Sequence, residues 1–328
     1  MNKIKTFIKD TYKYLIVYII LFIISIIPLP YYINAPGGLI NISDRITVDK
    51  GYKTKGSLNL SYVSEYDGRV ISLLIAIFNK NWDINKKNKQ IVNNEHYIDK
   101  LALMSAYNNA TYVAYKKANK KVDITSNNLY VEYIFKESKT NLQVGDKIEY
   151  IDNKKVIDRD SLNNIINNYH ENDKISITVK KNNKEEKRTA TLIKKDDRLM
   201  IGISLLEFNE LKASPSIKYN YKQDESGPSG GLMLSLAIYN SLVKDDITHS
   251  KIIVGTGTID KDGKVGPIDG VEYKIKGVAK KHVDLFFVPK DNLKEALKVK
   301  KKNHYKIKIV GVSTFDEALN YLLDLEND

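Results

Sequence analysis

The residues best suited to covalent chemistry lie in segment 224–242, which reads DESGPSGGLMLSLAIYNSL. Gly227 and Pro228 predict a turn, Ser229 follows it, and an apolar helix is expected to begin at Leu232. A serine in this position lies at a helix N-terminus, where free N–H groups and the helix dipole favour negative charge. Acyl transfer needs this arrangement for its oxyanion, although a cluster of glycine, serine and proline is also typical of a plain turn.

A second segment supplies a candidate base. Residues 253–274 predict a strand and a hairpin-like turn that lead into a helix. Lys274 falls between Val271 and Val278 on the apolar face of that helix, whereas Lys276 falls on the opposite face. A lysine that points inward needs a partner or a lowered pKa, and either makes it a candidate general base.

The two segments together resemble a known family. The pairing of GPSxG with TGTIDxDGxVGPIxGxxxK and a later VPKDN (Val288–Asn292) is similar to the Lon-type proteolytic domain. More narrowly, it resembles the membrane-anchored, PDZ-containing Lon-like serine peptidases of Gram-positive bacteria, the YlbL/SepM type. The resemblance implies a Ser–Lys dyad of Ser229 and Lys274, 45 positions apart. It also implies that Thr256 supports the lysine by a hydrogen bond.

The supporting residues of the site follow from the same segments. Ser226, Gly227 and Gly230 surround Ser229 and are expected to form the oxyanion region. Gly230 replaces the alanine that the family usually has, and Asp269 replaces a glycine, which brings a carboxylate near the active-site turn. The chain has no phosphate-binding loop, so we expect no ATP-driven unfolding of substrates. No cofactor and no metal site is expected.

An uncharged run near the N-terminus predicts a membrane anchor. Residues 14–33 (YLIVYIILFIISIIPLPYYI) number twenty, enough for a helix of about 30 Å, the thickness of a bilayer core. Lysines precede the run, and no charge follows it before Asp44. The positive-inside rule then predicts a cytoplasmic stub at 1–13, a transmembrane helix at 14–33 and a catalytic part outside the cytoplasm. A buried core helix is the alternative.

The rest of the chain predicts an α/β (α+β) fold with an inserted β-rich unit. Segment 34–121 has turn chemistry at 34–38 and a helix at 97–117, and is expected to open the protease domain that 198–328 completes. Residues 79–94 are polar and predict little regular structure. Residues 122–197 are strand-rich and carry LQVGDKI followed by IDNKKV, which resembles a PDZ domain. Such a unit captures peptides by strand addition or has a purely structural role.

The amino-acid composition limits the kinds of partner that the chain is expected to bind. The chain has 328 residues, a net charge of +12 and no cysteine, which excludes thiol nucleophiles and disulfides. Its lysines are spread along the chain rather than gathered with aromatic residues, so we expect no nucleic-acid partner. The basic run 298–302 is predicted to be a solvated helix face, with a mild attraction to anionic lipid or wall polymers as the alternative. The expected partners are peptide or protein substrates outside the cell and, through one N-terminal helix, the membrane. An oligomer is possible.

Two other functions fit parts of the sequence. Gly227–Gly231 also matches the G-x-S-x-G pattern of Ser-His-Asp esterases, whose base would be His249, His282 or His304. A catalytically silent PDZ scaffold is the other alternative. The intact serine, lysine and threonine favour the peptidase.

Overall fold

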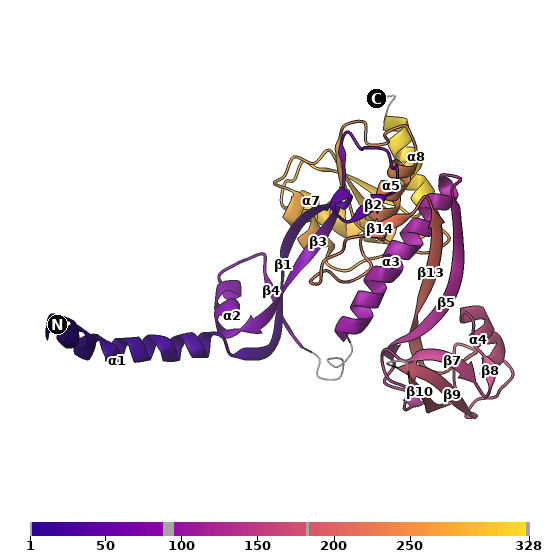
Figure 1. The fold of residues 1–328 in the computed structure, drawn as a ribbon, viewed down its shortest axis with the longest axis horizontal. Coiled ribbons are helices and arrows are strands. Elements are labelled where there is room, and N and C mark those ends of the chain that lie inside the picture. The colour runs from indigo at the N-terminus through magenta and orange to yellow at the C-terminus, as the bar shows by residue number, and fades with distance from the viewer. Residues whose placement is uncertain (1, 88–94, 182–183, 326–328) are drawn as a thin grey trace.

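The computed structural model describes residues 2–87, 95–181 and 184–325. The chain forms an N-terminal helix, a larger α/β body and a smaller β-rich unit, joined by long strands (Figure 1). The six-stranded sheet of the body has the order β19-β18-β15-β3-β1-β4. Its strands are β1 (Pro28–Asn41), β3 (Ser57–Arg69), β4 (Asp83–Lys86), β15 (Ile252–Gly255), β18 (Leu285–Pro289) and β19 (Lys308–Val312).

Helices cover both faces of this sheet. Successive residues of a strand point to opposite faces, so Ile253 and Phe287 enter one hydrophobic cluster, whereas Val254 and Phe286 enter another. The first cluster contains α3 (Glu95–Lys117), α5 (Gly231–Leu242) and α8 (Phe315–Asp324), and the second contains α6 (Val271–Val278) and α7 (Leu293–Lys302). This three-layer arrangement confirms the predicted mixed α/β class, and α3 confirms the helix expected at 97–117.

The β-rich unit has its own hydrophobic cluster. Its seven-stranded sheet contains β13, β5, β7, β9, β10, β6 and β8. Its elements are β5 (Lys121–Ile134), β6 (Lys139–Thr140), β7 (Lys147–Ile151), β8 (Lys154–Lys155), α4 (Arg159–Ile166), β9 (Lys174–Lys181), β10 (Lys184–Thr191), β11 (Ile193–Lys195), β12 (Arg198–Met200) and β13 (Ile203–Ser214). Fifteen buried side chains, from Leu129 to Ile201, form a core separate from that of the body.

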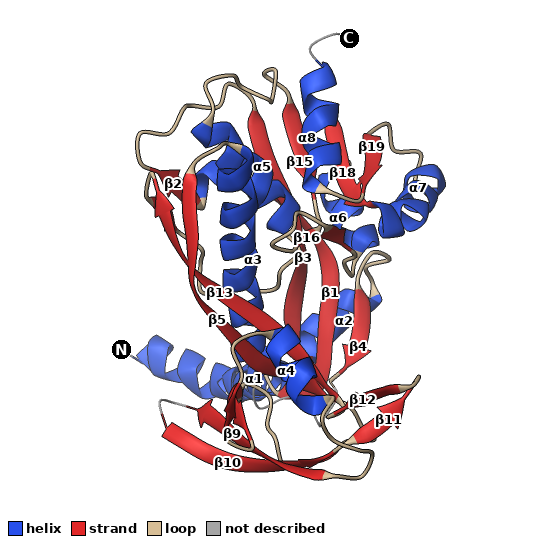
Figure 2. Cartoon of the chain, turned by 90° about the vertical axis from the view of Figure 1, so that its right-hand side faces the viewer, coloured by secondary structure: helices blue, strands red, loops and turns tan. Residues whose placement is uncertain are grey.

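The antiparallel ribbon of β5 and β13 belongs to both parts. Val122, near the start of β5, packs in the core of the body, whereas Leu129 and Val131 pack in the core of the β-rich unit. Figure 2 shows the ribbon running from the side of α3 down to the strands and helix of the smaller unit. Because the body core draws residues from before and after this ribbon, the β-rich unit interrupts the body in sequence.

The N-terminal run differs from the predicted single span. Helix α1 comprises Asn2–Ser25, and the chain enters strand β1 at Pro28, so the prediction of one helix over 14–33 is wrong. Proline lacks the N–H that a helix needs and disfavours helical geometry in the residue before it, and both Pro28 and Pro30 lie in the run. Among residues 2–87, 95–181 and 184–325, no helix is both long enough and apolar enough to cross a membrane.

Two local predictions also need correction. The turn expected at 34–38 is instead an irregularity inside β1, where its pairing with β3 shifts between Pro36 and Leu39. The polar segment 79–94 contains strand β4, which pairs with β1 through Tyr31–Asn34, while residues 88–94 lie outside the described part. Short elements complete the body: α2 (Val70–Ile77), β2 (Ile46–Val48), β14 (Ile217–Tyr219), β16 (Thr258–Ile259), β17 (Val265–Gly266) and two 3-10 turns at Ile42–Asp44 and Lys290–Asn292.

Candidate active site

Ser229 lies immediately before helix α5. Gly230 is the N-cap of this helix and Gly231 its first residue, close to the start predicted at Leu232. A Cβ on Gly231 would lie 2.7 Å from Ile259 Cγ2 and 2.8 Å from the Ile259 backbone nitrogen, so only glycine allows this approach. A Cβ on Gly230 would meet the flexible end of Leu60 at 3.2 Å, a tight but adjustable contact. Gly231 thus lets the first turn of α5 lie against β16.

Lys274 lies on the buried face of α6. It is 3% exposed, with Val271, Ile275 and Val278 buried on the same helix, as the sequence pattern predicted. Burial lowers the pKa of Lys274 from its ordinary 10.5 to about 8, and the carboxylate of Asp269 opposes this by raising it. At pH 7, a pKa of about 8 leaves about one Lys274 amine in ten neutral, against about one in 10³ for a free lysine.

Thr256 connects the two residues. Its side chain is fully buried at the end of β15, its Oγ1 accepts a hydrogen bond from Lys274 Nζ at 2.9 Å, and it donates to the backbone carbonyl of Ser229 at 3.0 Å. The Gly257 N–H also donates to this carbonyl, at 2.7 Å. Among the described contacts, Thr256 thus links Lys274 Nζ to the backbone of Ser229, and no direct hydrogen bond joins the Ser229 hydroxyl to Lys274 Nζ. The structure therefore brings these three predicted residues together.

We expect Thr256→Val to lower kcat about 5- to 20-fold and leave KM nearly unchanged, because loss of one neutral hydrogen bond costs about 1 kcal/mol and the residue acts through the lysine. The hydroxyl oxygen also stabilises the ammonium form, so its loss should shift the midpoint of the pH–rate profile downward. Thr256→Ser keeps the hydroxyl and should restore both values. A kcat and midpoint that match the wild type in Thr256→Val would contradict the assigned role.

The oxyanion region differs in detail from the prediction. The Gly227 N–H donates to the Asp99 carbonyl at 3.1 Å and is therefore occupied, and Pro228 has no N–H. Within the described residues, the N–H groups of Ser229 and Gly230 have no hydrogen-bond acceptor, and both lie at the N-terminus of α5. Ser226 is exposed. The geometry thus favours the N–H groups of residues 229 and 230 as oxyanion donors, in place of those around Ser226 and Gly227.

A cavity of about 520 Å³ opens over Ser229. One wall is the segment of β3 from Ser61 to Tyr66, and the other is the loop 222–230 that leads to the serine. The parallel pairing of β15 with β3 ends at Leu60, whereas β1 continues to pair with β3 as far as Arg69. At residues 61–64, which line the cavity, the edge of β3 that faced β15 is therefore no longer paired with it.

An ion pair that the sequence did not reveal holds the loop before Ser229. Arg45 Nε and Nη2 contact Glu225 Oε1 at 2.7 and 2.6 Å, with side chains that are 9% and 19% exposed. Lys100 Nζ donates to the carbonyls of Lys222 and Glu225 at 2.6 and 3.1 Å. Arg45 and Glu225 are 180 positions apart, so no local pattern could have paired them. Arg45 is buried beside the loop that leads to Ser229, and we expect it to hold this loop in position.

The three histidines of the esterase alternative lie elsewhere. His249 Nε2 contacts the Leu322 carbonyl at 3.0 Å, and His282 and His304 are exposed. None of them lines the cavity over Ser229. The described positions of these three histidines therefore do not support the esterase alternative.

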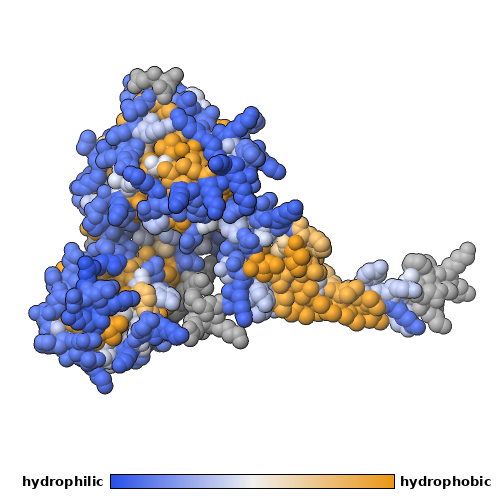
Figure 3. Space-filling view, turned by 180° about the vertical axis from the view of Figure 1, so that it is seen from behind, coloured by the Kyte–Doolittle hydropathy of each residue, from blue (hydrophilic) through white to orange (hydrophobic). Residues whose placement is uncertain are grey.

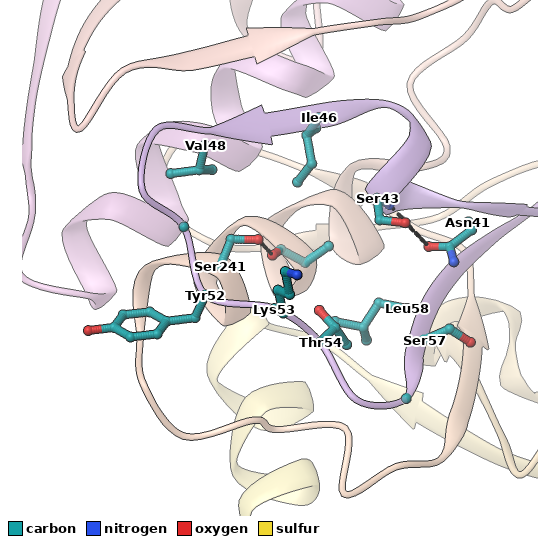
Figure 4. Close-up of a pocket in the computed structure, with 13 residues that line it drawn as sticks. Asn41, Ser43, Ile46, Val48, Tyr52, Lys53, Thr54, Ser57, Leu58 and Ser241 are labelled. Carbon is teal, nitrogen blue, oxygen red and sulfur yellow. Dashed lines mark hydrogen bonds between the residues drawn. The ribbon is translucent and has the colours of Figure 1, made fainter.

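A second cavity, of about 390 Å³, lies at the other end of α5 (Figure 4). Figure 4 shows Asn41, Ser43, Thr54 and Ser241 around it, with Ser43 donating to Asn41 Oδ1 at 2.9 Å. Ser241 follows Ser229 by twelve residues, or about 18 Å along a helix. This cavity is therefore separate from the serine and contributes nothing to its chemistry.

Comparison with known proteins identifies the part of the chain that carries these residues. Residues 222–325 match the Lon protease (S16) C-terminal proteolytic domain. Ser229, Thr256 and Lys274 all lie within the matched range, and the match supports a serine peptidase. This Lon-type region, together with the earlier strands and helix of the body, forms the site described above.

Individual relatives agree with this match. The chain is 33% identical over 103 residues to a Lon protease of Metamycoplasma arthritidis and 32% identical over 100 residues to one of Trichlorobacter lovleyi. These alignments cover 31% and 30% of this chain and 12% of each relative. The chain thus spans about one-eighth of the length of the curated relatives it matches.

Solved structures of small domains are similar to about a quarter of the chain. The crystal structure of the PDZ domain of an SdrC-like protein from Listeria monocytogenes has 23% identity and a TM-score of 0.23, and covers 26% of this chain and 93% of its own. The second domain of another Listeria protein, solved in solution, has 26% identity and a TM-score of 0.22, and covers 26% and 88%. Peptide capture by the PDZ-like unit stays a prediction.

Proposed function

We propose that the chain is a membrane-attached serine endopeptidase of the YlbL/SepM type, which acts without ATP outside the cytoplasm on peptides or exposed protein segments. The observation that carries the proposal is the buried Lys274, whose pKa is lowered to about 8 and whose Nζ is linked through Thr256 to Ser229. A surface lysine would have neither the burial nor the link. Burial lowers the pKa of the amine and so raises the fraction of neutral base that acyl transfer needs.

In the proposed reaction the neutral amine of Lys274 accepts the proton of the Ser229 hydroxyl as the oxygen attacks a peptide carbonyl. The tetrahedral intermediate places its negative oxygen at the N–H groups of residues 229 and 230. The protonated lysine then gives its proton to the leaving amine, which releases the first product. Water, deprotonated by the same lysine, attacks the ester carbonyl and regenerates the serine.

The edge of β3 supports an extended substrate. Residues 61–64 line the cavity on one side of Ser229, and they lie beyond the end of the β15–β3 pairing at Leu60. Extended peptides bind such edges by adding a strand, so that main-chain hydrogen bonds position the scissile bond. This mode requires an unfolded segment, in keeping with the absence of an ATP-binding loop from the sequence.

The peptidase proposal is tested with internally quenched, unstructured peptides, cut by the full chain in detergent or nanodiscs without ATP. We expect turnover by the wild type and loss of at least about 10³-fold in Ser229→Ala, the range found when a nucleophile is removed. Cleavage by Ser229→Ala at the wild-type rate would refute the proposal.

Membrane attachment rests on exposed apolar side chains. From Tyr14 to Ile24 every side chain is exposed, for example Phe22 at 65%, and Figure 3 shows this apolar shaft projecting from the hydrophilic body. Lipid would cover it more favourably than water does. Protease added to intact, wall-stripped cells should digest the body and spare a tag on Met1, as the lysines at the N-terminus predict. Protection of the body would reverse the proposed orientation.

The PDZ-like unit is expected to bind protein substrates and to take no part in the cleavage reaction. Leu129 and Glu207 face each other in the β5–β13 ribbon, so a two-residue Asn-Gly turn can replace residues 130–206 and close the ribbon as a hairpin. This variant should cut small peptides within about threefold of the wild type, and cut natural protein substrates at least about tenfold more slowly, since strand addition would no longer hold them. Loss of small-peptide cleavage in a folded variant would make the unit part of the catalytic fold.

A further inference from the structure

Helix α2 presents an apolar surface that the proposed catalysis does not use. Its eight residues, Val70–Ile77, carry no charge, and only Ala76 is buried. The outward side chains of the helix and the residue after it form what we call the platform: Ile71 at 48% exposure, Leu74 at 53%, Ile75 at 51%, Ile77 at 67% and Phe78 at 87%. Contiguous apolar surfaces of this kind mark sites of interaction.

The platform continues the apolar surface of α1. The two helices are in contact, and the residues that join α1 to β1, Ile26 and Ile27, are 42% and 43% exposed. Figure 3 shows one apolar area that extends from the shaft of α1 to the base of the body. A lipid or protein surface that covers the apolar side chains of α1 would therefore also contact α2.

The border of the platform has the composition of a membrane interface. Tyr66 in β3 precedes α2, Trp82 follows it, and their rings stack with centroids 5.5 Å apart. Arg69 and Lys80 flank α2 and its C-terminal Phe78, and both are exposed. Tryptophan and tyrosine favour the level of the lipid headgroups, and basic side chains attract anionic lipids.

We propose that the platform lies in the headgroup–acyl boundary of a lipid bilayer, as a second membrane contact beside α1. The inference rests on the proposed membrane attachment and adds to it a fixed orientation of the body. A second copy of the chain fits less well, because a two-fold contact between platforms would bring Arg69 and Lys80 of one copy near those of the other. A bilayer with anionic lipid would bury the apolar side chains of the platform and attract the basic side chains at its border.

The platform would set the distance of the active site from the membrane. Strand β3 passes directly into α2 at Arg69–Val70, while its residues from Ser61 onward line the cavity over Ser229. The eight residue steps from Ser61 to Arg69 span about 26 Å at about 3.3 Å per residue, which is an upper limit on the height of that wall. Membrane-bound substrates would then be cut outside the lipid, within that height.

The chain contains no cysteine, so single labels can be placed without altering it otherwise. The full chain is made as Phe78→Cys and, as a matched control on exposed helix α7, as Lys294→Cys. Each carries a nitroxide and is bound to vesicles of phosphatidylcholine and phosphatidylglycerol, with flotation as proof of binding. The measurement is the collision rate of the label with oxygen and with a water-soluble nickel chelate. We expect the label at 78 to collide with the chelate at least fivefold less than the label at 294.

Two results would overturn the platform while leaving other proposals standing. Equal chelate collisions at both positions in vesicle-bound protein would place α2 in water, although attachment through α1 would hold. Spin–spin broadening at position 78 that disappears on dilution with unlabelled chain would assign the platform to a second copy. Failure to float would overturn attachment and platform together, whereas cleavage of small peptides by the same samples reports separately on the peptidase.

Discussion

Replacing Lys274 by methionine is expected to lower kcat by about 10²- to 10⁴-fold, the usual contribution of a general base, and to make the folded protein more stable. Burial disfavours the ammonium form, which lowers the pKa of Lys274 from 10.5 to about 8. At about 1.36 kcal/mol per pH unit, this difference corresponds to about 3 kcal/mol of destabilisation when the lysine is charged. Methionine removes that charge and keeps an apolar side chain of similar length.

The pH dependence of this stability gain has a defined sign. The folded pKa lies below the unfolded one, so the penalty is fully present below pH 8 and disappears as the pH rises towards 10.5. Urea unfolding should therefore show Lys274→Met more stable than the wild type by about 2–3 kcal/mol at pH 7 and much less so at pH 10.5. Lys274→Arg should be inactive as well, since a guanidinium stays protonated.

Lys276 provides the matched control on the same helix. It pairs with Glu272 at 2.6 Å, with side chains that are 11% and 42% exposed. An ion pair with one exposed partner contributes about 1 kcal/mol or less, so Lys276→Met should keep kcat within about twofold and change stability little. Full activity in Lys274→Met, or equal effects of both substitutions, would contradict the role of Lys274.

Arg45→Met is expected to give the second large effect. Removing one partner of a fully buried ion pair costs about 3–5 kcal/mol, and we expect the low end of this range because Glu225, which lies in the loop before Ser229, is 19% exposed. The loop would lose its fixed position, so kcat should fall about 10- to 100-fold while the dependence on Lys274 stays the same. Urea unfolding and steady-state kinetics measure the two effects.

A double replacement distinguishes the contribution of the ion pair from the cost of leaving one charge without its partner. Arg45→Met combined with Glu225→Leu removes both charges and should recover most of the lost stability, as hydrophobic replacements of buried pairs do. Lys117 and Asp316 form an exposed pair at 2.8 Å and serve as the control, with an expected loss of less than about 1 kcal/mol in Lys117→Met. Equal losses in the buried and exposed pairs would show that Arg45 does not hold the loop.

Local patterns predicted the parts of the site that depend on neighbouring residues. The glycine–proline turn and the apolar run placed Ser229 before α5, and the helical spacing placed Lys274 on the buried face of α6. Each of these features depends only on residues that are close together in the sequence. The hydrogen bond between Lys274 and Thr256, however, was expected only through the family resemblance, because eighteen positions separate the two residues.

Features set by distant contacts could not be predicted in this way. Arg45 contacts Glu225 across 180 positions, and the occupied N–H of Gly227 depends on the Asp99 carbonyl of α3. The turn chemistry of Pro36 and Gly37 became an irregular stretch of β1, because pairing with β3 overrides the local preference. The point at which helix gives way to strand within residues 14–33 could not be located from the apolar pattern, because isoleucine and tyrosine occur in both structures.

The most direct test of the Ser–Lys assignment is the pH dependence of labelling by a fluorophosphonate, with the adduct located by peptide mass spectrometry. The adduct should form on Ser229, at a rate that rises with pH through a midpoint near 8, the pKa of Lys274. In Lys274→Met the rate should fall by at least about 10²-fold and lose this midpoint. Labelling of another serine, or labelling of Ser229 at the same rate and with the same midpoint in Lys274→Met, would contradict the assignment.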